Sequence, residues 1–368
     1  MLLRAFVVHR FHTFLPLVTI LWSLSLGICF SGCTPGDKVG RTPQNEEAAA
    51  QAESEAQQQL AASNFSGAVA PLRELARLRP ETPDILNMLG TCVLRSPDRQ
   101  SFLAAARADL QRDPNDVIAL TIASNALTDP NDQKERFTLM RRLVELRGQD
   151  DALRLALAQE LLNAHFYAEA REHLDILLSH PEKSDGGNAA KALPYYLRGK
   201  ARFFEATDTA SLAAAEADLN ESVQRNPKLG WAYLYLGRIY LRRNQTSEAK
   251  APLEKSQELL PQSVEPLFEL ARVHHALGDQ AGAAKYEAEF RQRKALEQRA
   301  VSQTTRADAF PQDFDLQLQA ATTLIEKGDF EKASLYLRRA LALRPGDVRA
   351  RALARRLISI AESSGNAH

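Results

Sequence analysis

A fixed spacing of 34 residues is the sequence feature that most constrains the fold of this chain. The spacing separates four pairs of small residues or prolines: Gly237 and Ala271, Ala249 and Ala283, Pro227 and Pro261, and Pro80 and Pro114. A period of this length is typical of repeat proteins, in which one unit cannot bury its apolar face alone and therefore stacks on its neighbours. We expect the units to stack into a continuous superhelix.

Each unit has the residue pattern of two packed helices. Large side chains such as Tyr233, Leu236 and Tyr240 recur at helical spacing and are expected to fill the space between repeats. Gly237 and Ala271 are expected where the two helices of a repeat cross, because only a small side chain lets the backbones approach. Prolines are expected to end the second helices, at Pro181, Pro227, Pro261 and Pro345.

The last unit contains Gly328-Asp329-Phe330 in the expected turn, followed by Ala333, Leu337, Ala340, Leu343 and Pro345. This pattern resembles the second half of a tetratricopeptide repeat. The resemblance implies an all-α fold, a right-handed superhelical solenoid of about eight helix-turn-helix repeats with a C-terminal capping helix.

Phasing the chain on the repeat places the solenoid at residues 47–362 and a disordered tail at residues 363–368. The expected units lie at about residues 49–82, 83–116, 117–150, 151–182, 192–229, 230–263, 264–299 and 314–347. Residues 294–313 break the phase, which predicts an extended second helix and then a loop around Pro311. Residues 348–361 are amphipathic and are expected to cap the last apolar face.

The first 32 residues have the pattern of an export signal. Arg4 and Arg10 precede an apolar run over residues 14–30, as in secretory signals. The run ends in Phe30-Ser31-Gly32-Cys33, which resembles the lipobox of bacterial lipoproteins and implies a diacylglyceryl group on Cys33, although that family usually has Leu, Val or Ile in place of Phe30. An ordinary cleaved signal and a retained membrane anchor are the alternatives, since about 17 apolar residues is the lower limit for a span.

Residues 33–46 are polar and rich in Pro and Gly, so we expect a flexible tether between a membrane and the solenoid. These features predict an exported, membrane-anchored lipoprotein of the cell envelope that faces the periplasm. Thr34 after the cysteine favours the outer membrane, by analogy with enterobacterial lipoproteins.

Charge and cysteine content narrow the partners further. The chain has 46 basic and 46 acidic residues, and removal of Arg4 and Arg10 with the signal leaves 44 basic ones. A nucleic-acid binder would carry a basic excess, so that partner is excluded. Cys29 lies in the signal and Cys33 would be lipidated, which leaves Cys92 with no disulfide partner; we expect it to be a small buried apolar residue.

No catalytic or cofactor motif is present in the sequence. It lacks the phosphate-binding patterns GxxxxGK[ST] and GxGxxG, the zinc pattern HExxH and the nucleophile pattern GxSxG. The histidines do not pair with carboxylates at metal-ligand spacing. We therefore expect a protein that is not an enzyme, with no cofactor and no metal.

A partner-binding groove is expected on the first helices of units five to seven, because the resemblance implies that these helices line the concave face. Lys200, Arg238 and Arg272 occupy one equivalent position in these units, and Tyr196, Leu234 and Phe268 lie four residues earlier. Trp231, Arg242 and His275 are nearby. Cations beside an aromatic strip suit an extended or acidic protein segment. The alternative is that the cations are solvated and the aromatic residues belong to the core.

These features predict a non-catalytic protein-interaction scaffold that recruits or assembles partner proteins at an envelope membrane. The alternative is an accessory docking subunit of an envelope enzyme complex. Both follow from the family resemblance and the export signal, and a structural protein of the cell surface is disfavoured by the absence of β-rich or disulfide-linked modules.

Overall fold

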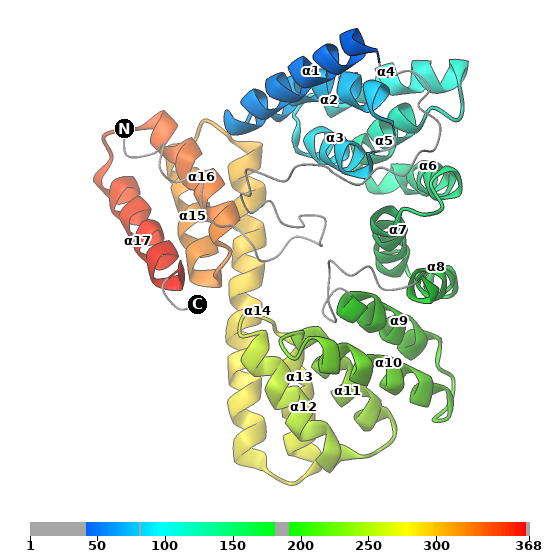
Figure 1. Ribbon diagram of the computed structural model, residues 1–368. Helices are drawn as coiled ribbons and strands as arrows, with labels where there is room; N and C mark the ends of the chain where they lie inside the picture. Colours follow the sequence, from blue (N-terminus) through cyan, green and yellow to red (C-terminus); the bar gives the residue numbers. More distant parts are fainter. Residues whose placement is uncertain (1–41, 81, 181–190, 366–368) are drawn as a thin grey trace. The chain divides into compact units, whose positions relative to one another are not determined.

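The computed structural model describes residues 42–80, 82–180 and 191–365, and helices form all the regular structure in these ranges. They fall into two compact units, and the division between the units comes after residue 181 of the sequence. In each unit most helices pack against the helix that follows them in the chain (Figure 1). The expected all-α fold of helical hairpins is confirmed.

The N-terminal unit packs around an apolar core that includes Leu72, Leu89, Leu103 and Ile122. Helix α3 lies against both α2 and α5 and has few contacts with α4, which packs mainly on α5. The helices of this unit are α1 (Pro43–Ala61), α2 (Phe65–Leu78), α3 (Pro83–Arg95), α4 (Arg99–Arg112), α5 (Val117–Ala126), the 3-10 turn η2 (Pro130–Asp132), α6 (Gln133–Leu146), α7 (Asp151–Asn163) and α8 (Tyr167–Ser179).

The C-terminal unit is built from four consecutive helix pairs and a terminal helix. Its helices are α9 (Ala192–Glu205), α10 (Ser211–Arg225), α11 (Gly230–Arg242), α12 (Thr246–Leu259), α13 (Glu265–Ala276), α14 (Gln280–Ala309), α15 (Phe314–Lys327), α16 (Phe330–Leu343) and α17 (Val348–Gly365). The first helices of neighbouring pairs also touch, α9 with α11 and α11 with α13. This contact places equivalent positions of these three helices side by side.

Small residues lie at the helix crossings, as the sequence predicts. A Cβ atom added at Gly237 would lie 2.5 Å from Cγ of Leu253 on the partner helix, and one added at Gly199 would lie 2.8 Å from Cγ of Leu219. Both leucines are completely buried. Helices α11 and α12, and likewise α9 and α10, can approach this closely only because glycine stands at the crossing.

The expected phase break after residue 294 is one continuous helix. Helix α14 contacts α13 and also α15, and Ala300 and Ala307 in its second half are buried in a core shared with α15, α16 and α17. The helix ends at Ala309, before the loop that contains Pro311. Both the extended helix and the loop around Pro311 are thus confirmed.

The helical boundaries differ from the expected ones at both ends. Helix α1 begins at Pro43, so residues 43–46 are helical and the expected tether is shorter by four residues: Thr42 accepts a hydrogen bond from the Asn45 N–H (3.3 Å), and proline at the first helical position already has a helical φ. Helix α17 extends to Gly365, which places residues 363–365 of the expected tail in the helix.

The export signal and Cys33 lie outside the described residues. Among the helices of residues 42–365 that the structure describes, none is both long enough and apolar enough to cross a membrane.

Candidate functional site

Two of the three expected groove cations share one buried carboxylate. Arg238 of α11 donates from Nε to Oε1 of Glu269 (2.9 Å), and Arg272 of α13 donates from Nη1 to Oε2 of the same residue (2.7 Å). Glu269 is only 5% exposed. The two arginines are therefore held in a network internal to the protein, and the site has its own counter-charge for both.

Lys200 of α9 differs from both arginines. Its side chain is half-buried, and no carboxylate of the described residues pairs with it. Burial lowers the pKa of Lys200, and the nearby positive charge of Arg238 lowers it further. A half-buried cation without an anion is costly, because neither water nor an opposite charge fully compensates it.

Aromatic residues flank Lys200 along α9. Tyr196 and Phe204 lie one helical turn before and after it on α9, and both pack against Tyr235 of α11, with ring centroids 6.1 and 5.9 Å apart. Phe203 packs edge-on against Tyr235 as well, at 5.3 Å. The Arg238 guanidinium lies over the Tyr235 ring, 5.3 Å from its centroid.

Phe204 is 42% exposed, and Phe268 on α13 is 48% exposed. Phe268 packs against Phe290 of α14 at 5.7 Å, and the Arg272 guanidinium lies over its ring. We call Lys200, Arg238, Phe204, Phe268 and Arg272 the cation–aromatic face. It combines exposed aromatic rings with a net positive charge. The three cations of the face, Lys200, Arg238 and Arg272, outnumber the single carboxylate of Glu269 that pairs with the two arginines.

Four residues expected in the groove have other roles. Leu234 has no exposed surface and belongs to the core, so it cannot contact a partner. Trp231 packs against the same core. Arg242 donates to the carbonyl oxygens of Phe203 and Ala206 (both 2.8 Å) at the end of α9, and His275 pairs with Glu287 (2.7 Å).

Tyr196 is 8% exposed, and burial raises its pKa far above the ordinary value. Tyr196 packs against Tyr235 beneath the cation–aromatic face and does not form part of its exposed surface. The repeat phase predicts which residues share a helix face, and it left open whether the aromatic residues line the groove or belong to the core. It does not show how deeply the neighbouring helix covers that face.

Several residues of the face were not expected from sequence. Tyr235 lies next to Leu234, and Phe203 and Phe204 lie three and four residues after Lys200. Glu269 could have been found from its place three residues before Arg272, a spacing that pairs charges along a helix. Its second partner, Arg238, comes from the preceding repeat, and this contact has no local signal.

Cys92, His173 and His180 are held within the folded structure. Cys92 is 1% exposed, and burial raises its pKa to about 11, which agrees with a small buried apolar residue. His180 pairs with Asp151 (2.6 Å), and burial lowers the pKa of His173. Within the ranges that the structure describes, no group of three His, Cys, Asp or Glu side chains could hold a metal ion.

Comparison with protein families identifies the repeat. Residues 53–117 and residues 314–347 each match a family model described as tetratricopeptide repeat. These two segments are similar to tetratricopeptide repeats. The second match coincides with the last unit expected from the sequence, and it covers α15 and α16.

Solved tetratricopeptide-type structures with similar folds have low sequence identity to this chain. MamA is 17% identical over 47% of this chain and 95% of its own, with a TM-score of 0.40. PilW, described as a type IV pilus biogenesis factor, is 14% identical over 68% and 94%, with a TM-score of 0.42. PilF of Pseudomonas aeruginosa is 14% identical over 68% and 93%, with a TM-score of 0.45. No curated protein is similar to the chain in sequence.

Proposed function

We propose that this protein is a non-catalytic scaffold that binds an acidic protein segment on the cation–aromatic face of α9, α11 and α13. Tetratricopeptide repeats present the surfaces of their stacked helices to protein partners. The observation that carries the proposal is Lys200, a half-buried cation that no described carboxylate pairs with, flanked along α9 by Tyr196 and Phe204.

The chemistry of the segment follows from what the face lacks. Arg238 and Arg272 already share Glu269, whereas Lys200 needs an anion. A carboxylate of the partner at Lys200 would make a charge-assisted hydrogen bond, and neighbouring apolar side chains of the partner would cover Phe204 and Phe268. The best ligand is thus an extended segment that combines acidic and apolar residues.

The proposal includes a place in the cell. The basic and apolar start of the chain, followed by Phe30-Ser31-Gly32-Cys33, supports export and lipidation of Cys33. The scaffold would then be tethered to an envelope membrane and recruit partners in the periplasm, with the outer membrane favoured by Thr34.

Capture of partners from solubilised membranes of the source cells tests the function. The immobilised chain is compared with Lys200→Gln and with Lys228→Gln, which changes an exposed lysine of the same unit. Lys200→Gln should lose the stoichiometric partners and Lys228→Gln should keep them. Equal capture by all three proteins would refute the role of the face, and an enzyme among the partners would favour the docking-subunit alternative.

A further inference from the structure

The terminal helix α17 presents a basic surface to solvent. Its main neighbours are α16 and, to a smaller extent, α15 (Figure 1). Ala350 and Leu357, which lie two helical turns apart, are buried against them. Arg351, Arg355 and Arg356 are exposed. The helix therefore covers the last apolar core with one side and displays arginine on the other.

These arginines have no counter-charge within the described part of the chain. No carboxylate there pairs with Arg351, Arg355 or Arg356, or with the exposed Arg338 of α16. Arg351 donates from Nε to the carbonyl oxygen of Pro345 (2.9 Å), which leaves its positive charge uncompensated. Four guanidinium groups are thus available to an external anion.

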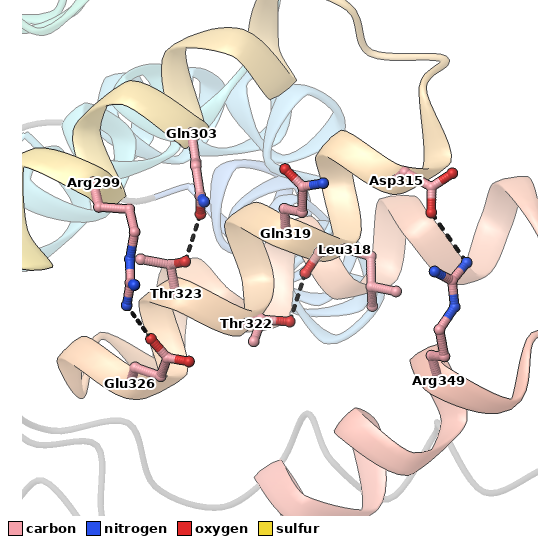
Figure 2. Close-up of a pocket in the computed structure, with 9 residues that line it drawn as sticks. All are labelled: Arg299, Gln303, Asp315, Leu318, Gln319, Thr322, Thr323, Glu326 and Arg349. Carbon is pink, nitrogen blue, oxygen red and sulfur yellow. Dashed lines mark hydrogen bonds and ion pairs between the residues drawn. The ribbon is translucent and has the colours of Figure 1, made fainter.

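Other arginines of this region are neutralised by the protein itself. Arg349 donates to Asp315 of α15 (3.0 Å), and Arg299 of α14 pairs with Glu326, as Figure 2 shows. These pairs link α14 and α17 to α15 and cancel their own charges. They are not part of the basic surface.

The charge of the last two helices is opposite to that of the rest of the described chain. Residues 330–365 contain eight Lys or Arg and three Asp or Glu, whereas residues 42–329 contain 34 basic and 42 acidic residues. A chain that is neutral as a whole is thus divided into an acidic body and a basic end. Charge asymmetry of this kind is typical of binding to a polyanionic surface.

The composition of the surface favours a membrane over a protein partner. Protein interfaces depend on a few buried aromatic or apolar anchors, and α17 contains no aromatic residue. Its exposed positions beside the arginines include the small residues Ala352 and Ser359, which leave the long side chains free to extend. Guanidinium groups bind phosphate oxygens in a bidentate manner, and a bilayer offers many phosphates in one plane.

We propose that Arg338, Arg351, Arg355 and Arg356 bind the phosphate groups of an anionic phospholipid membrane. Basic residues on a helix surface strengthen binding to an anionic leaflet, and they add to the effect of an acyl chain. This contact would set the orientation of the C-terminal unit, with its cation–aromatic face, relative to the bilayer. It depends neither on Lys200 nor on acylation of Cys33.

Photo-crosslinking of the full chain to lipid vesicles tests the proposal. One set of vesicles contains phosphatidylglycerol and phosphatidylcholine and the other phosphatidylcholine alone, and both carry a phospholipid with a photoactivatable head group. Cross-links to residues 348–360, located by mass spectrometry, should form on the anionic vesicles at 50 mM salt. They should be several-fold fewer at 500 mM salt and on the neutral vesicles, because salt screens the attraction.

Variants complete the test. Arg355→Gln with Arg356→Gln should reduce these cross-links roughly twentyfold, since each basic residue near an anionic surface strengthens binding about fivefold. Arg291→Gln with Arg306→Gln is the matched control. It removes two exposed arginines of α14 that also pair with no described carboxylate, and it should cross-link like the wild type.

Equal cross-linking on neutral and anionic vesicles would overturn the proposal, as would wild-type cross-linking of the Arg355 and Arg356 variant. Absence of α17 cross-links together with binding of a polyglutamate peptide to α17 would also overturn it, and would assign the surface to an acidic polypeptide. Cross-links to the N-terminal residues report membrane anchoring separately. Failure of the lipid anchor is therefore distinguishable from failure of the basic surface.

Discussion

Gly237 sets the distance between two helices through the absence of a side chain. A methyl group there would lie 2.5 Å from Cγ of the fully buried Leu253. Gly237→Ala should therefore destabilise the fold by about 1–3 kcal/mol, although alanine is the better helix former. Gly148→Ala is the matched control: its nearest neighbour is 4.0 Å away, so the change should be neutral in a thermal melt. Equal melting of both variants would contradict the close crossing.

The Arg238–Glu269–Arg272 network predicts a second effect at this scale. Arg238→Gln leaves Oε1 of buried Glu269 without its donor and should cost about 1–3 kcal/mol in the free energy of unfolding. Glu269→Gln in the same background should recover part of that loss, as seen in denaturant titrations. Arg107→Gln removes an exposed pair with Glu135 and should change stability by less than about 1 kcal/mol. If Arg107→Gln lowered the free energy of unfolding as much as Arg238→Gln does, the claim that burial of Glu269 makes its ion pair important for stability would be contradicted.

The helix α14 is the element that joins two parts of the C-terminal unit. It contacts α13 and also α15, and Ala295 is exposed between its buried Ala283 and Ala300. Ala295→Pro removes a helical hydrogen bond and should cost about 3 kcal/mol, so α15, α16 and α17 should unfold at lower denaturant than α9–α13. Hydrogen exchange measures both groups of helices, with Ala295→Ser as the control. A single unchanged transition for the proline variant would contradict the role of α14.

The elements show which parts of the fold could be predicted from sequence. Small residues and prolines in phase predicted the hairpins, and the break in the repeat phase at residues 294–313 predicted the extended helix. The start of α1 was placed four residues late because a single capping residue, Thr42, decides it. For the site, the repeat phase predicted which helices carry Lys200, Arg238 and Arg272, and their role in binding stays a prediction. Packing between repeats decides the complete burial of Leu234 and the ion pair between Arg238 and Glu269. Neither could be predicted from the sequence of one helix.

At the scale of the whole molecule, the proposed lipid anchor at Cys33 determines where the chain acts. Cys33→Ser should move the protein from the membrane to the soluble exported fraction and remove the mass of a diacylglyceryl group. Cys92 does not compete with Cys33 for the lipid, because Cys92 is buried and its thiol is protonated at neutral pH. Cys92→Ala alone is the control and should stay in the membrane fraction. Unchanged fractionation and mass of Cys33→Ser would contradict lipidation.

The central claim is that Lys200 is placed to receive a carboxylate from a partner. The direct measurement is the dissociation constant of a fluorescent peptide of aspartate, glutamate and phenylalanine, at 50 and 500 mM salt. The wild type should bind more weakly at high salt, and Lys200→Gln should bind at least about tenfold more weakly at low salt, the effect of losing a charge-assisted contact. Its melting temperature should not fall, since an uncompensated cation is removed. Lys228→Gln is the control and should bind like the wild type, and wild-type affinity in Lys200→Gln would contradict the account.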